Sequence, residues 1–407
     1  MVMMYKRRYL EEKVLELTRS FKVLYLAGPR QVGKTTLLNY LAKKFSINYV
    51  SLDDLDQRRL AQEDPALFLQ KHTPPLFIDE VQYAPQLFPY LKIKVDQSSK
   101  NGQYWLTGSQ QFAIMKNLKE SLAGRVGIIN LLGFSLAEVL GYPRQKLPFL
   151  PGRKIVVTKP LGIKEIFKII LRGSFPVLTH RHPPSLSTFY NSYLQTYIDR
   201  DLRDIFNISK ISDFHRFFSL CAARTAQILN ISEIAKDAGI SVHAAQEWLN
   251  ILESSFQIYL LRPYYRNISK RMIKAPKLYF IDTGLAAYLT KWKTVDTLLN
   301  GAMAGAFFET FVVTEIIKSY WFRGEEAPIY YFRDKEKHEV DLLIEQDGLI
   351  YPLEIKLSSR ISPSDLANIN YLRKKMKNVA KGAVISAGTN YLPLDRENLI
   401  IPASLIS

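Results

Sequence analysis

A glycine-rich segment near the start of the chain, residues 28–36, constrains the fold more than any other feature. Its sequence is Gly28-Pro29-Arg30-Gln31-Val32-Gly33-Lys34-Thr35-Thr36. In such a loop, backbone N–H groups close around phosphate oxygens, Lys34 brings positive charge to the β- and γ-phosphates, and the Thr35 hydroxyl can bind Mg²⁺. An apolar run at 21–27 precedes the loop, and leucines at helical spacing follow it. The segment therefore predicts a phosphate-binding strand–loop–helix unit, with a plain glycine turn as the alternative.

A second apolar run, at 76–78, ends in two acids, Asp79 and Glu80. A buried strand here leaves Asp79 at the carboxyl edge of a parallel sheet, where α/β folds bind their ligands. Asp79 is predicted to hold Mg²⁺ together with Thr35. Glu80 is predicted to orient or deprotonate the water that attacks the γ-phosphate. The pattern is weak alone, but its pairing with the loop makes it a specific nucleotide-site signal.

A third strand is expected at 103–107, and it ends in Gly108 and Ser109. Ser109 is a candidate nucleotide contact that could sense the γ-phosphate, and an ordinary turn is the alternative reading. Strand and helix patterns alternate up to about residue 140, which predicts an α/β domain over 1–145. The middle of the chain, 160–295, reads as mostly helical, and 300–407 begins with a helix that gives way to period-two strands.

Composition points to a polyanionic partner. Of the 407 residues, Lys and Arg exceed Asp and Glu by 17, so we expect a nucleic acid, DNA first, although a charged soluble surface would give the same balance. The only cysteine, Cys221, allows neither an intrachain disulfide nor a cysteine-based zinc site. No apolar run reaches the ~18 residues of a membrane span. We therefore expect a cytoplasmic protein with no membrane span, and self-association into a homo-oligomer stays open.

The middle region contains a helix-turn-helix candidate at 231–253. Ser232 is expected to cap the first helix, Gly239 to form the turn, and Ser241 to cap the second helix. Strands expected at 258–263 and 277–281 could supply a wing. The predicted groove-facing residues are His243, Gln246 and Glu247, and the nearby basic residues are Arg262, Arg266, Lys270, Arg271, Lys274 and Lys277. A winged helix is thus expected, used either for DNA contacts or only for packing and protein contacts.

A hairpin in the last third carries the second chemical signal. Asp347-Gly348 between alternating strands predicts a two-residue turn, which places Asp341 opposite Glu354 and Glu339 opposite Lys356. Facing acids repel unless a cation or proton lies between them. Such a set suits Mg²⁺ or Mn²⁺, with Asp341 and Glu354 as ligands and Lys356 stabilising charge during phosphodiester cleavage.

On the preceding helix at 306–313, Glu309 is a candidate further metal ligand. The alternative for the whole cluster is a solvated hairpin face with an ion pair between Glu339 and Lys356. The spacing of the acids and the lysine is common by chance, and the hairpin register gives it weight.

Together these residues resemble an uncharacterised prokaryotic and archaeal family of AAA-type ATPases that carry a C-terminal domain of unknown function, DUF4143. The motifs that carry the resemblance are 28–36, 78–82, 106–109, 122–126, 173–176, 197–202 and 280–285. The resemblance implies an AAA-type P-loop NTPase domain, a winged-helix domain and a restriction-endonuclease-like C-terminal domain of the PD-(D/E)xK type. It also implies ATP rather than GTP, and Arg125 as a sensor or finger arginine.

The expected function is an ATP-hydrolysing, DNA-associated protein whose nucleotide state is coupled to a metal-dependent nuclease-like domain. ATP and Mg²⁺ are its expected cofactors. The catalytic candidates are Glu80, Lys34, Arg125, Asp341, Glu354 and Lys356. The alternative is a nucleotide-dependent switch or scaffold that uses an inactive nuclease fold to bind partners.

Overall fold

The computed structural model describes residues 5–108, 114, 118, 120–152, 155, 159–197, 211–265 and 274–407. The chain divides into two compact units. Unit 1 comprises Met1–Phe134 with the short segments Ser254–Phe256 and Trp321–Glu325, and unit 2 comprises the remainder. Within the described ranges, no helix is both long and apolar enough to cross a membrane.

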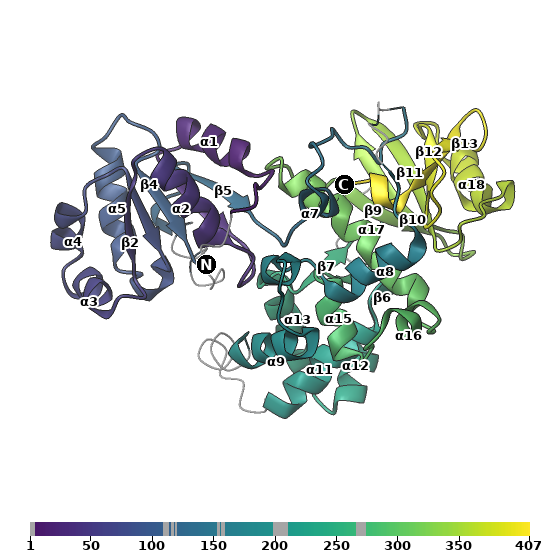
Figure 1. Cartoon of the computed structure of the whole chain (residues 1–407), viewed down its shortest axis with the longest axis horizontal. Coiled ribbons are helices and arrows are strands. Elements are labelled where there is room, and N and C mark those ends of the chain that lie inside the picture. Colours follow the sequence, from purple (N-terminus) through teal and green to yellow (C-terminus); the bar gives the residue numbers. More distant parts are fainter. Residues whose placement is uncertain are drawn as a thin grey trace. The chain divides into compact units, whose positions relative to one another are not determined.

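Unit 1 is built on a five-stranded sheet in the order β2-β3-β4-β1-β5, in which every pair is parallel. Figure 1 shows this sheet with its helices around it. The strands are β1 (Val23–Ala27), β2 (Asn48–Ser51), β3 (Leu76–Asp79), β4 (Tyr104–Thr107) and β5 (Val126–Asn130). The helices are α1 (Glu11–Ser20), α2 (Lys34–Lys44), α3 (Leu55–Glu63), α4 (Pro65–Lys71) and α5 (Leu87–Asp96), with a 3₁₀ turn at Val81–Tyr83.

The inner strands of this sheet read as continuous apolar runs because helices cover both faces of a parallel sheet. All of β1, β3 and β4 is buried. The predicted strand–loop–helix order is confirmed, since β1 leads through residues 28–33 into α2. Since all five strands run the same way, their carboxyl ends meet at one edge, and the ends of β1, β3 and β4 bring the loop, Asp79 and Thr107 together there.

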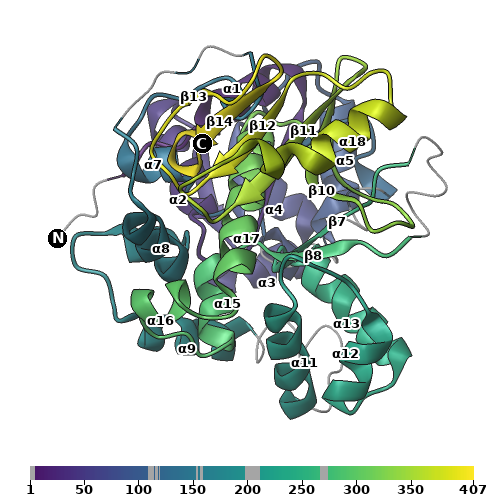
Figure 2. The ribbon, with the colours of Figure 1, turned by 90° about the vertical axis from the view of Figure 1, so that its right-hand side faces the viewer.

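Unit 2 contains a six-stranded mixed sheet in the order β13-β14-β12-β11-β10-β9. Its strands are β9 (Ile329–Arg333), β10 (Glu339–Gln346), β11 (Leu349–Lys356), β12 (Gly382–Ser386), β13 (Leu392–Pro393) and β14 (Asn398–Pro402). Helix α18 (Ala367–Lys375) lies beside β10 and β11 (Figure 2). Its Ile369 and Leu372 pack with Leu343, Ile350 and Val384 of the sheet. The predicted α/β architecture of the two ends of the chain is confirmed.

The middle of unit 2 is mostly helical, as predicted. Its helices are α8 (Ile163–Arg172), α9 (Leu186–Tyr197), α11 (Ile211–Ala223), α12 (Ile231–Ala238), α13 (Val242–Ser254), α15 (Thr283–Leu289) and α16 (Val295–Leu299). Helix α7 (Leu136–Leu140) precedes this region in the chain, and α17 (Ala304–Trp321) follows it. Three short strands, β6 (Gln227–Ile228), β7 (Ile258–Leu261) and β8 (Lys277–Phe280), form an antiparallel sheet in the order β6-β8-β7. The predicted division into 1–145, 160–295 and 300–407 stays a prediction.

Helices α12 and α13 occupy the predicted helix-turn-helix. Gly239 ends α12 at φ +70, a left-handed conformation that glycine adopts without steric cost, and the Ser241 hydroxyl accepts from the Ala244 N–H at the start of α13. One cap prediction is wrong. Asn230, not Ser232, caps α12, because its side-chain oxygen accepts from the Glu233 N–H at 3.2 Å. The first helix therefore begins one residue before Ser232.

The side chain of Asp282, at the end of β8, joins three parts of the helical region. Its Oδ1 accepts from the Tyr190 hydroxyl and the Leu285 N–H, both at 2.8 Å. Its Oδ2 accepts from the N–H and the hydroxyl of Ser174, at 2.7 and 2.8 Å. Each carboxylate oxygen therefore accepts two hydrogen bonds. The Asp282 carboxylate caps α15, and it also holds the turn after α8 and the helix α9 against the start of α15.

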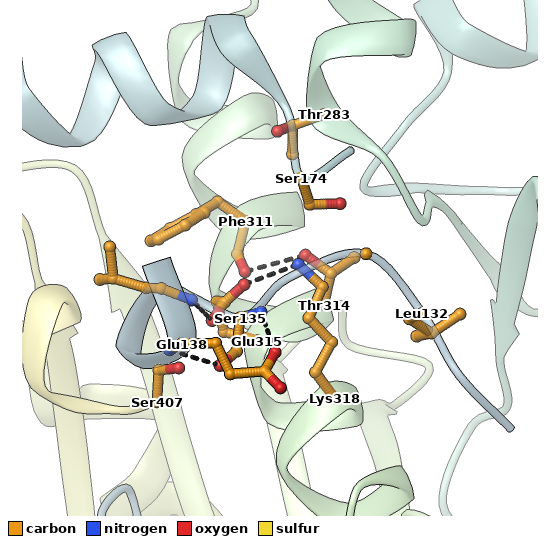
Figure 3. Close-up of polar contacts among 12 residues, drawn as sticks. Leu132, Ser135, Glu138, Ser174, Thr283, Phe311, Thr314, Glu315, Lys318 and Ser407 are labelled. Atoms are coloured by element: carbon orange, nitrogen blue, oxygen red, sulfur yellow. Dashed lines mark hydrogen bonds and ion pairs between the residues drawn. The ribbon is translucent and has the colours of Figure 1, made fainter. Parts of the chain in front are cut away.

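A buried glutamate on α17 holds the first turn of α7 (Figure 3). The Leu136 N–H donates to Glu315 Oε2 at 2.7 Å, and the Ala137 N–H donates to the Ser407 hydroxyl at 3.1 Å. Lys318 Nζ lies 2.8 Å from the other oxygen of Glu315. These contacts satisfy backbone donors that the first turn of any helix leaves without a partner, and they tie α7 to α17 within unit 2.

Candidate nucleotide site and acid–lysine cluster

The phosphate-binding loop is packed tightly against the segment that follows β5. A Cβ at Gly28 would lie 2.0 Å from the Leu131 carbonyl oxygen, and the Gly28 φ is +145. Only glycine fits both this contact and this conformation. The Leu131 N–H donates to the carbonyl of Ala27, the last residue of β1, at 2.8 Å, so the β1–β5 pairing extends to the residue directly before the loop. The loop is thus supported from beneath by main chain.

Lys34 begins α2 and is buried, and its Nζ donates to the carbonyls of Gly28 at 2.9 Å and Pro29 at 2.8 Å. The ammonium therefore lies over the loop, at the start of a helix whose dipole favours an anion. Thr35 and Thr36 lie in the first turn of α2. Gln31, in the loop, has φ +60.

Asp79, at the carboxyl end of β3, faces Thr35 across the sheet edge. The Thr35 hydroxyl donates to Asp79 Oδ1 at 3.0 Å, and the Thr107 hydroxyl at the end of β4 donates to the same oxygen. The Tyr49 hydroxyl is 3.4 Å from Oδ2. Burial raises the pKa of Asp79, while the hydrogen bonds from Thr107 and Thr35 lower it. A hydroxyl and a buried carboxylate side by side are the oxygen donors that Mg²⁺ prefers.

Glu80 follows in a left-handed conformation, with φ +55 and ψ +45. Such a backbone costs a non-glycine residue about 1–3 kcal/mol and is found mainly at functional sites. Gln82 donates its amide N–H to Glu80 Oε2. A Cβ at Gly108 would lie 2.4 Å from the Gln82 side-chain oxygen, so the end of β4 closes on this pair. Ser109, the predicted γ-phosphate sensor, lies outside the described residues.

The position of Arg125 corrects its predicted role as a sensor in the same nucleotide site. Arg125 directly precedes β5, whose Val126 pairs with Val23 at the start of β1. Arg125 therefore lies at the amino edge of the parallel sheet, whereas the loop lies at the carboxyl edge. The length of a strand, at about 3.3 Å per residue, separates the two edges. Its guanidinium pairs with Asp96 at the end of α5. A finger role toward a second copy stays a prediction.

Sequence reasoning missed Arg8, which is buried beneath the phosphate-binding loop. Its guanidinium donates to the carbonyls of Val32 at 3.0 Å and Leu132 at 2.8 Å, and it lies 4.6 Å from the centre of the Phe134 ring. It therefore links the loop to the segment leaving β5. No local pattern separates Arg8 from the other basic residues near the start of the chain. Thr107 was also missed, although its place at the end of an inner parallel strand is a usable signal.

The predicted hairpin register is confirmed at the tip of β10 and β11. Gln346 pairs with Leu349, and the pairing continues to Leu342 and Leu353. Beyond that point β10 is irregular, since its register against β9 shifts between Val340 and Leu343. The Asp341 carboxylate, at this irregularity, accepts from the Ile355 N–H at 2.8 Å. The bulge thus turns the Asp341 side chain toward β11.

Asp341, Glu354 and Lys356 come together as predicted. Lys356 Nζ lies 2.8 Å from Glu354 Oε2 and 4.0 Å from Asp341 Oδ2. Burial first, and then the Asp341 charge, raise the pKa of Glu354 to about 8, and the Glu354 side chain is only 1% exposed. Both carboxylates in turn raise the pKa of Lys356 above its ordinary value, although burial opposes them. Glu354 Oε1 is buried with no hydrogen-bond partner within the described part of the chain.

Glu309 is placed differently from its prediction as a metal ligand. Its Oε1 accepts from the Tyr279 hydroxyl at 2.6 Å and from Lys277 Nζ at 3.2 Å. Glu339 pairs with Lys277 at 2.6 Å and Arg333 at 3.3 Å rather than with Lys356. Among the described residues, no three His, Cys, Asp or Glu side chains are grouped to hold a metal. The three-carboxylate set is therefore not assembled, because cationic and hydroxyl groups already occupy Glu309.

One of the basic residues predicted to contact phosphate from the middle region is buried instead. Lys277 is 3% exposed and pairs with acids, so its predicted phosphate contact is wrong. Arg266, Lys270 and Arg271 lie outside the described residues. His243, Gln246 and Glu247 are exposed on α13, as a groove-facing set requires. No local sequence pattern indicates that Lys277 and Tyr279 join the C-terminal acids, because the partners lie far apart along the chain.

Three domain descriptions match successive parts of the chain. An AAA domain matches residues 20–140, a domain of unknown function (DUF8612) matches 163–296, and a second domain of unknown function (DUF4143) matches 304–406. Two uncharacterized proteins, one of Mycobacterium tuberculosis and one of Mycobacterium bovis, are each 27% identical to this chain over 406 residues. The matched region covers 99% of this chain and 85% of each relative.

Two solved structures are also similar. A Walker-type ATPase of Pyrococcus abyssi is 14% identical with a TM-score of 0.43, over 70% of this chain and 96% of that one. The RuvB Holliday junction branch migration motor of Thermotoga maritima is 18% identical with a TM-score of 0.29, over 62% of this chain and 88% of that one. At these scores neither structure assigns an activity to this chain.

Proposed function

We propose that this chain, which belongs to the AAA-type ATPases that carry a C-terminal DUF4143 domain, is a DNA-associated ATPase whose nucleotide state controls a metal-dependent nuclease-like domain. The family implies nucleotide binding and hydrolysis. The proposal adds ATP and Mg²⁺ as the ligands, DNA as the partner, and the C-terminal acid–lysine cluster as a second site.

The hydrogen bond between Thr35 and Asp79 supports the nucleotide half. The hydroxyl and the carboxylate, 3.0 Å apart at the edge of the sheet, would hold a divalent ion, which would offset negative charge on the phosphates. Lys34 would exchange the carbonyls that it now contacts for phosphate oxygens, which carry more negative charge. Glu80, held beside Gln82, would orient the attacking water.

The proposal for the C-terminal site rests on Glu354 Oε1, which is buried and has no hydrogen-bond partner among the described residues. A buried carboxylate oxygen without a hydrogen bond is costly unless a cation or a proton meets it. Asp341 and Glu354 therefore fit a hard divalent ion, which when bound would polarise water and a phosphodiester. Lys356, whose side chain is 34% exposed, is accessible enough to contact a phosphate while it keeps Glu354 in place.

DNA association is supported by the excess of 17 positive charges and by the exposed face of α13. That face carries His243, Gln246 and Glu247 and no Lys or Arg, which favours backbone contacts from elsewhere over direct base readout. Arg125, at the sheet edge away from its own loop, supports a homo-oligomer in which it reaches a neighbour's nucleotide.

The test is a cleavage assay on end-labelled single-stranded, duplex and branched DNA with Mg²⁺ or Mn²⁺, with and without ATP. We expect cleavage by the natural protein and its loss in Asp341→Asn. The matched control is Asp347→Asn, which removes the same charge from the same hairpin at an exposed turn residue with φ +52, a conformation that Asn accepts. Cleavage that persists in Asp341→Asn would refute the assignment. The ATP dependence of cleavage by the natural protein measures the coupling between the nucleotide site and the nuclease-like domain.

A second candidate is the nucleotide-dependent switch with an inactive nuclease fold. It is favoured by the contacts of Glu309, which bind Lys277 and Tyr279 rather than leaving a third carboxylate for a metal. Intact ATP hydrolysis with no cleavage under any of the above conditions would favour this function.

A further inference from the structure

One cation of the C-terminal cluster comes from outside the DUF4143 match. Lys277 is the first residue of β8, which pairs with β6 and β7 of the middle region. Its ammonium lies 2.6 Å from Glu339 and 3.2 Å from Glu309, and its side chain is 4% exposed. Burial alone would lower the pKa of this ammonium, but the carboxylates of Glu309, Asp341 and Glu339 raise it above its ordinary value.

Main-chain contacts fix Lys277 in this place. The Tyr264 N–H donates to the Tyr331 carbonyl at 2.7 Å, and the Tyr331 N–H donates to the Arg262 carbonyl at 3.1 Å, so the segment after β7 is joined to β9. The Tyr331 hydroxyl donates to the Ala275 carbonyl at 2.5 Å, two residues before Lys277, and its ring centre lies 5.7 Å from the ammonium. The lysine is therefore held by the fold and is not a mobile side chain.

The charges around Lys277 limit what else the site can hold. Four carboxylates, those of Glu309, Glu339, Asp341 and Glu354, face three cationic groups, those of Lys277, Lys356 and Arg333. When all four carboxyl groups are ionised, as metal binding requires, the described cluster carries one more negative than positive charge, which one divalent ion more than compensates. Two-metal sites place their ions about 3.5–4 Å apart and need carboxylates on both. Here the carboxylates that would serve a second ion already bind an ammonium.

We propose that Lys277 is a positioning residue that fills a fixed cation position of the C-terminal site, so that this site admits one divalent ion, at Asp341 and Glu354, and not two. The site is then a composite of the middle region and the DUF4143 region. This inference rests on the proposed metal-dependent function. It assigns Glu309 and Glu339 to holding the ammonium, with the Tyr279 hydroxyl as a further partner of Glu309.

The test counts Mn²⁺ ions bound by the full-length, nucleotide-free protein, by calorimetry and by the spin-resonance signal of bound Mn²⁺. We expect one ion that disappears in Asp341→Asn. Lys277→Met should double this to two, because Glu309 and Glu339 are then free of the ammonium. Lys277→Arg should stay at one. The double variant Lys277→Met with Glu309→Gln should also return to one, because it removes a carboxylate that the second ion needs.

Lys277→Met that binds the same number of ions as the natural protein would overturn the inference. Loss of the buried ammonium can also unfold the variant. In that case, refolding on addition of Mn²⁺, followed by circular dichroism, supports the inference, and a variant that stays unfolded with Mn²⁺ overturns it. The proposed function fails separately, if the natural protein binds no ion that depends on Asp341. A gain of one ion in Lys277→Met over the natural protein would support the cation position even then.

Discussion

The carboxylate of Asp282 gives the sharpest test of how unit 2 is held together. Replacing Asp282 with Asn keeps the shape but turns one of two acceptor oxygens into a donor. That donor would face either the two donors of Ser174, or the Tyr190 hydroxyl and the Leu285 N–H. A buried donor left without its acceptor costs about 1–3 kcal/mol, so two of them should cost about 2–6 kcal/mol.

The assay is thermal unfolding followed by circular dichroism and by calorimetry. For a unit of this size, each kcal/mol lowers the melting temperature by about 2–4 °C, so Asp282→Asn should lower the transition of unit 2 by about 4–24 °C. Ser174→Ala removes one hydroxyl donor and should cost only about 0.5–1.5 kcal/mol.

Asp296→Asn is the control, because its exposed ion pair with Lys164, at 3.5 Å, is worth about 0–1 kcal/mol. A melting temperature of Asp282→Asn within error of the Asp296→Asn value would refute the claim that this carboxylate joins α8, α9 and α15.

Three further predictions concern the two sites. Lys34→Ala should lower ATP hydrolysis by about 10²-fold or more, as loss of a donor to a developing charge does, whereas Lys43→Ala on the exposed face of the same helix should not change the steady-state rate. Thr107→Val removes a hydrogen bond that lowers the pKa of Asp79, so that pKa should rise further and the acid limb of the ATPase pH–rate profile should move to higher pH. Because the pKa of Glu354 is raised to about 8, a proton competes with a metal below that pH, so Mn²⁺ affinity should rise with pH up to about 8 and level off above it. An affinity that stays flat over the roughly two pH units below the raised pKa of Glu354 would contradict this.

Local patterns predicted the parts of the molecule whose partners are close in sequence. The strand, loop and first turn of α2 are one continuous stretch, so residue types and spacing determine their geometry. The β10–β11 register followed from a two-residue turn, because turn length fixes which residues face each other. The register then predicted that Asp341 would meet Glu354, although the contact itself depends on an irregularity in β10 that no local pattern indicates.

Other features of the sites depend on residues far apart in sequence. Arg125 belongs to the motif at 122–126, but the direction of the parallel strands places it at the edge opposite the phosphate-binding loop. Arg8 reaches Val32 and Leu132 because α1 is packed on the sheet beside β1 and β5. These placements follow from the order of strands in the sheet, which short-range periodicity does not encode.

The sequence by itself determined the strand–loop–helix unit around residues 28–36 and the acid–lysine hairpin in the last third of the chain. Only the tertiary structure decided that Lys277, from the middle region, enters the hairpin's cluster and that Glu309 serves this lysine. The physical reason is the range of the forces. Turns and helix starts are set by neighbouring residues, whereas a buried charge is compensated by whichever group packing brings within a few ångströms, regardless of its place in the chain.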